Sequence, residues 1–169
     1  MDFRGCDEHY IEQIYTCCWF NTYRLGGKNG VIRDCIQNGN MVTRTNAEGL
    51  PENWPEELEM KERVTEPILV KNVENVIVED AENQQLIAVF AYATKRTIIN
   101  RNSTNTLCAN VGSDWLEEGI FFTQDGGNMI VLNSMQALGT SYDCIKGKLT
   151  MYNRITIDYP NERFEEVEK

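Results

Sequence analysis

The sequence predicts an all-β protein, folded as a single-domain antiparallel β-sandwich or β-barrel of about nine or ten strands. The first observation is a strand near the C-terminus: in residues 148–159 every odd position except Asn153 is apolar. Successive side chains of a strand point to opposite faces, so this segment predicts a half-buried strand. The apolar positions are Leu149, Met151, Ile155, Ile157 and Tyr159.

The second observation is a set of turn signals between short apolar runs. Asn38-Gly39 separates residues 31–36 from residues 41–45, and this dipeptide suits a tight turn with positive φ. Asp125-Gly126-Gly127-Asn128 separates residues 120–124 from residues 129–133. Both patterns predict β-hairpins.

The third observation is the run 86–93, which is apolar at odd and at even positions and predicts a central strand covered on both faces. Near the N-terminus, apolar residues at helical spacing predict a short helix over residues 7–14, followed by a strand over residues 15–24. Residues 161–169 form an acidic tail, predicted to be frayed or a short helix after a single domain of residues 1–160.

The net charge of −10 disfavours binding to nucleic acids and to anionic membranes, because phosphate contacts need clustered Lys and Arg. Seven glutamates in residues 48–66 are opposed only by Lys61 and Arg63. This segment predicts binding to a protein partner with a basic surface; the alternative interpretation is a solvated loop that keeps the chain soluble. The predicted partner-binding residues are Glu52, Trp54, Glu56, Glu57 and Glu59.

Six cysteines are many for an intracellular chain of 169 residues, and they suit up to three disulfides. Asn102-Ser103-Thr104 is an acceptor sequence for N-glycosylation. Together these features favour a secreted glycoprotein, although no signal peptide is present in this chain. The disulfide candidates are Cys6, Cys17, Cys18, Cys35, Cys108 and Cys144.

No motif in the chain assembles catalytic or metal-binding groups, so we expect no catalytic residue, metal or cofactor. His9 is the single histidine, and a nucleophile–base pair with Cys6 would have no third group to orient it. The cysteines lack the close pairs of a zinc site. The turn at residues 125–128 offers too few oxygen ligands for calcium, and Trp115 beside Glu117 is typical of a half-buried aromatic at a strand end.

The leading hypothesis is a non-enzymatic secreted binding protein. The predicted order of elements resembles the lipocalin architecture: a short helix, then a first strand that carries Trp19, then meandering hairpins. The glycine expected two positions before that tryptophan is absent. This resemblance implies an alternative, a β-barrel carrier of a small apolar ligand. Another alternative is an intracellular acidic inhibitor. The ligand-binding candidates for the carrier are Trp19, Tyr23, Phe90 and Tyr92.

Overall fold

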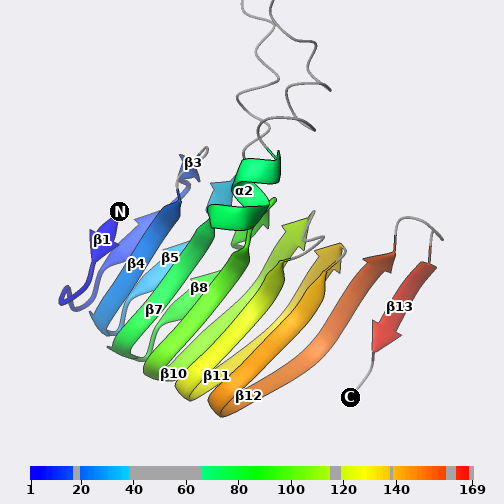
Figure 1. Cartoon of the computed structure of the whole chain (residues 1–169). Coiled ribbons are helices and arrows are strands. Elements are labelled where there is room, and N and C mark those ends of the chain that lie inside the picture. The colour runs from blue at the N-terminus through cyan, green and yellow to red at the C-terminus, as the bar shows by residue number, and fades with distance from the viewer. Residues whose placement is uncertain (17–19, 39–65, 115–118, 138, 159–162, 168–169) are drawn as a thin grey trace, which may run out of the picture.

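The computed structural model is a β-solenoid of about five turns, with nearly all strands parallel (Figure 1). It describes residues 1–16, 20–38, 66–114, 119–137, 139–158 and 163–167. The predicted antiparallel sandwich or barrel is therefore wrong, and so is the lipocalin-like barrel. Each coil of the chain stacks on the previous one, so every strand pairs with the equivalent strand one coil away.

Each coil has three faces. The first face contains β1, β4 and β7 together with the N-terminal parts of the three long strands, β10, β11 and β12. The second face contains β2, β5 and β8 together with the middle parts of the long strands. The third face contains β3, β6 and β9 together with the C-terminal parts of the long strands. The strands are β1 (Asp2–Phe3), β2 (Tyr10–Glu12), β3 (Tyr15–Thr16), β4 (Asn21–Lys28), β5 (Val31–Arg33), β6 (Ile36–Gln37), β7 (Glu74–Glu82), β8 (Gln85–Ile87), β9 (Phe90–Tyr92), β10 (Arg96–Asp114), β11 (Ile120–Ala137), β12 (Thr140–Asp158) and β13 (Arg163–Val167).

The core is built from columns of apolar side chains that stack from coil to coil. On the second face, the residue at the middle of each strand points inward, and its partner in the next coil is again apolar. Burial of this continuous column is what holds neighbouring coils together. The column consists of Ile11, Ile32, Leu86, Cys108, Val131 and Met151.

The corners between faces are marked by residues with positive φ. Asn29, Asn83 and Asn105 occupy the corner between the first and second faces, with φ of 57° to 58°. Asparagine tolerates this left-handed conformation, and its amide can bond to the amide one coil away. Asn83 donates to Asn29 over 3.1 Å, Asn105 donates to Asn83 over 3.0 Å, and Asn128 donates to Asn105 over 3.5 Å. We call this the first asparagine ladder.

Several predicted elements differ in the structure because a corner of the solenoid has the sequence pattern of a hairpin turn or of a strand interior. Residues 120–124 and 129–133 are not a hairpin: they belong to β11, turn at Asp125–Asn128, and pair with β10 and β12 instead of each other. The run 86–93 is divided by Ala88, a corner with φ of 52°, into β8 and β9. The hairpin predicted around Asn38 extends into residues outside the described part of the chain.

The helical elements also differ from expectation. Residues 7–14 contain β2 in place of the predicted helix. A helix, α2 (Glu66–Asn72), precedes β7, and its Leu69 packs in a small apolar cluster with Val73 and Tyr92. The predicted frayed tail contains β13, which pairs antiparallel with the Arg154–Asp158 part of β12.

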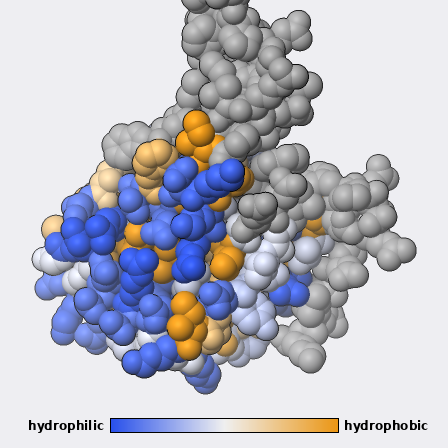
Figure 2. All heavy atoms as spheres, viewed as in Figure 1, coloured by the Kyte–Doolittle hydropathy of each residue, from blue (hydrophilic) through white to orange (hydrophobic). Residues whose placement is uncertain are grey.

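The first face carries an ion-pair network on its outer side, and Figure 2 shows hydrophilic residues gathered over these strands. Glu79 lies 3.1 Å from Arg24, 3.8 Å from Arg4 and 4.0 Å from Arg101. Arg4 also pairs with Asp2 at 2.6 Å, which holds the pKa of that carboxyl well below its usual range. These groups are paired with one another, so their charges partly compensate on this face.

Candidate functional site

A groove of about 630 Å³ runs across four successive coils at the edge between the second and third faces. We call it the lateral groove. Its wall is apolar, with Phe90 from β9, Met135 from β11 and Ile155 from β12. Met135 and Ile155 are 44% and 40% exposed, so their side chains are accessible to a ligand.

One column of outward positions on the third face, which contributes to the groove wall, is interrupted by glycine. Phe90, Gly112, Met135 and Ile155 occupy equivalent positions in successive coils. A Cβ atom on Gly112 would lie 2.9 Å from Cδ2 of Phe90, so the aromatic ring occupies the space that a side chain would fill. Glycine at this position therefore lets the Phe90 ring lie against the Gly112 backbone, where the ring forms part of the groove wall.

One rim of the groove is polar. Asn110, Asn133 and Asn153 occupy the corner between the second and third faces, with φ of 51° to 55°. Asn133 donates to Asn110 over 3.1 Å, and Asn153 donates to Asn133 over 3.0 Å. Each bond uses one N–H of a carboxamide that carries two, so this second asparagine ladder fixes the amides and leaves hydrogen-bonding capacity toward the groove.

Among the described residues, no titratable side chain lines the groove. Besides the residues already named, it is lined by Ala88, Val89, Val111 and Ser134. Its chemistry is that of a binding site, with an apolar wall and a row of neutral amides.

Of the predicted ligand-binding residues, Phe90 reaches the lateral groove and two others do not. Tyr23 is 1% exposed within the main core, where burial raises the pKa of its hydroxyl. Tyr92 lies in the small cluster under α2. Trp19 lies outside the described residues. The sequence reasoning missed Met135, Ile155 and the asparagine rim, and the recurrence of asparagine after 23 and 20 residues (110, 133 and 153) was the signal for the rim.

The predicted partner-binding residues Glu52, Trp54, Glu56, Glu57 and Glu59 all lie outside the described part of the chain. Asn102 is exposed at a corner with φ of 50°. Its glycosylation and the secretion of the chain therefore stay predictions.

The predicted disulfide framework is wrong for the cysteines that the structure describes, since Cys6, Cys35, Cys108 and Cys144 are all free. Cys35 and Cys108 are buried in the core as small apolar side chains, and burial raises the pKa of the Cys108 thiol. Parallel stacking places Cys108 beside Leu86 and Val131, not beside another cysteine. Cys17 and Cys18 lie outside the described residues.

The remaining candidate sites form no assembled centre. The imidazole Nδ1 of His9 lies 2.9 Å from the carbonyl oxygen of Cys6, and the ring stacks on Phe3 at 5.7 Å. In the part of the chain that the structure describes, no three His, Cys, Asp or Glu side chains converge as metal ligands. No helix among the described residues is long and apolar enough to cross a membrane.

Comparison of the chain with protein-family models, with curated proteins and with solved structures finds no match.

Proposed function

We propose that this chain is a non-enzymatic binding protein that holds a neutral, largely apolar small molecule in the lateral groove. The observation that carries the proposal is the lining itself: apolar side chains on the floor and wall, amides on one rim, and no titratable group. A ligand with an apolar body and a few neutral hydrogen-bonding groups matches this lining.

The size of the groove supports the same ligand class. Its volume of about 630 Å³ lies within the range of roughly 300–1,000 Å³ that is usual for small-molecule sites. Because the wall residues come from separate coils of a rigid stack, the site is formed before the ligand arrives. Binding of a basic protein through residues 48–66 is the second candidate, and it is supported by the charge of the sequence alone.

Titration with Nile red, a neutral apolar dye, tests the proposal. We expect the dye fluorescence to rise on binding to the full chain, and Met135→Asp to weaken the affinity about tenfold, because a charged group in the wall must be desolvated. Ile130→Asp is the matched control: Ile130 is 39% exposed on the same strand and does not line the groove. Equal loss of affinity in both variants, or no binding by the unchanged chain, would contradict the proposal.

A further inference from the structure

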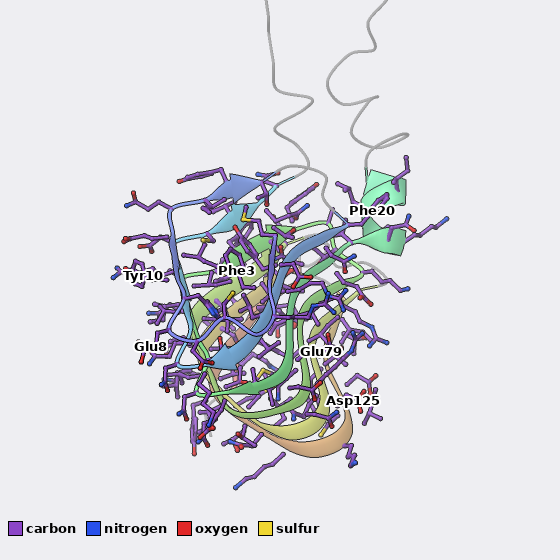
Figure 3. The ribbon with its side chains drawn as sticks, turned by 90° about the vertical axis from the view of Figure 1, so that its left-hand side faces the viewer. Phe3, Glu8, Tyr10, Phe20, Glu79 and Asp125 are labelled. Atoms are coloured by element: carbon purple, nitrogen blue, oxygen red, sulfur yellow. The ribbon has the colours of Figure 1, made fainter. Side chains whose placement is uncertain are left out.

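Among the described residues, both ends of the solenoid have strand edges and core side chains that no other element covers. At the C-terminal end, residues 140–152 of β12 have no strand partner on their outer edge among the described residues, because β13 pairs only with Arg154–Asp158. Leu149 and Met151, which continue the core columns, are partly exposed there. At the N-terminal end Met1, Phe3 and Ile14 are partly exposed in the same way, and Figure 3 shows Phe3 across the middle of that end. A solenoid end of this kind can accept further strands.

The first asparagine ladder ends in opposite charges. Glu8 precedes Asn29 at the N-terminal end of this column, and Lys148 follows Asn128 at the C-terminal end. Both side chains are exposed, and Figure 3 shows Glu8 on the side of the stack opposite Glu79. If a second copy continued the stack, Lys148 of one copy would occupy the position next to Glu8 of the other.

The second asparagine ladder ends in complementary amides. Asn153 donates toward Asn133 and leaves its own Oδ1 without a hydrogen-bond partner among the described residues. The same corner column begins at Gln13, an exposed residue with φ of 56°. In a continued stack the Gln13 amide would donate to Asn153 Oδ1, with the same direction as the bonds already present in this ladder.

The charges of the terminal coils agree with this pairing. Residues 1–16 contain four acidic side chains and one arginine, whereas residues 140–157 contain three basic side chains and one aspartate. In a continued stack Asp143 of one copy and Asp2 of the other would occupy neighbouring positions on the first face. Lys146 and Arg4 are near these aspartates in the sequence, and their positive charges would offset the repulsion between the two carboxylates. The overall charge of −10 opposes association at long range, so local complementarity must determine which surfaces meet.

From these observations we propose that the β12 edge binds the N-terminal coil of a second copy of this chain, head to tail and with parallel strands. The contact places Lys148 against Glu8, Asn153 against Gln13 and Met151 against Ile11, and it continues the columns within one molecule. Such an interface is heterologous, so it generates open chains of copies and not a closed dimer.

β13 regulates this contact. Its antiparallel pairing occupies the third-face edge of β12, where β3 of the second copy would otherwise add. The proposal therefore requires β13 to leave this edge for full stacking. Stacking and β13 compete for the same backbone groups, so weakening β13 must strengthen association.

The first test weakens β13 in the full chain. Consecutive residues of a strand direct their N–H groups to opposite edges, so one of Phe164 and Glu165 directs its N–H toward β12. The double substitution Phe164→Pro/Glu165→Pro therefore removes that N–H group from the pairing with β12. Phe164→Ala/Glu165→Ala is the matched control, because it shortens the same side chains and keeps both N–H groups. In sedimentation velocity we expect the double-proline variant to form a series of species above 19.4 kDa that lengthens with protein concentration. The double-alanine variant should associate less.

The second test exchanges the charges at the ends of the first ladder in the double-proline background. We expect Lys148→Glu alone and Glu8→Lys alone each to weaken association about tenfold, and the combined exchange to restore it. Lys95→Glu, an exposed position away from both ends, controls for the change in net charge and should alter association far less. Circular dichroism confirms that each variant is folded.

Three results would overturn the proposal. A double-proline variant that stays monomeric over the whole concentration range would show that the β12 edge does not bind a second copy. Association that stops at a dimer would indicate an isologous contact between two like ends. If the combined exchange of Lys148 and Glu8 does not restore association, Lys148 does not pair with Glu8 of a second copy.

Discussion

Gly127→Ala is expected to lower the free energy of unfolding by about 3 kcal/mol or more, because it combines left-handed backbone strain with a clash. Gly127 has φ of +74°, and a Cβ atom there would overlap the backbone carbonyl of Ser103, its partner in the preceding coil. A backbone group in a stacked corner cannot move without disturbing the pairing of β10 with β11.

Gly5→Ala is the matched control for this substitution. Gly5 has a similar φ of +79°, and nothing lies within 4 Å of the position that its Cβ would take. We therefore expect it to cost only the conformational strain, about 1 kcal/mol. Urea denaturation of both variants measures the difference, and equal losses of stability would show that Gly127 is not packed against Ser103.

Leu86→Ala is expected to lower the free energy of unfolding by about 3 kcal/mol, since it opens a cavity inside the second-face column. Leu86 is fully buried, with Ile32 and Cys108 as its partners in the neighbouring coils. Neighbouring side chains cannot fill the space without shifting a whole coil.

The adjacent residue is the control for Leu86. Ile87 is half-buried and points to the other side of the same strand, so Ile87→Ala should cost about 1 kcal/mol or less. Thermal and urea unfolding compare the two. A larger loss for Ile87 than for Leu86 would mean that the register of the second face is shifted by one residue.

Some strands were predictable from local pattern, as in residues 148–152, whereas their pairing was not. Leu149 and Met151 face the core as the alternation predicts, and Asn153, the exception in that alternation, is a corner with φ of 51°. Alternation states which side chains share a face, and it does not distinguish an antiparallel neighbour from a parallel one. Glycine-rich and asparagine-rich corners produce the same residue signals as hairpin turns, because both need positive φ.

The repeat is hard to find in the sequence because the residues of a core column share apolar character, not residue identity. The second-face column contains isoleucine, leucine, cysteine, valine and methionine at equivalent positions. Asparagine recurs more regularly, after 22 residues from Asn83 to Asn105 and 23 to Asn128, but 54 residues separate Asn83 from Asn29. This long interval between the second and third coils hides the period.

The candidate site could be predicted only in part for the same reason. Phe90 is a ligand-binding candidate of the carrier hypothesis, yet its neighbours in the groove come from positions 112, 135 and 155. Those positions become adjacent only when the coils stack in parallel. Without the register, no pattern in the sequence connects Phe90 with Met135.

Amide-to-amide nuclear Overhauser effects in the ¹⁵N-labelled full chain test the parallel register of the coils. The solenoid predicts cross-strand contacts between Leu107 and Ile130 and between Ile130 and Thr150. A hairpin over residues 120–133 would instead produce contacts between Thr123 and Ile130. Observation of the first two contacts without the third would establish the stacked coils, and the reverse result would contradict them.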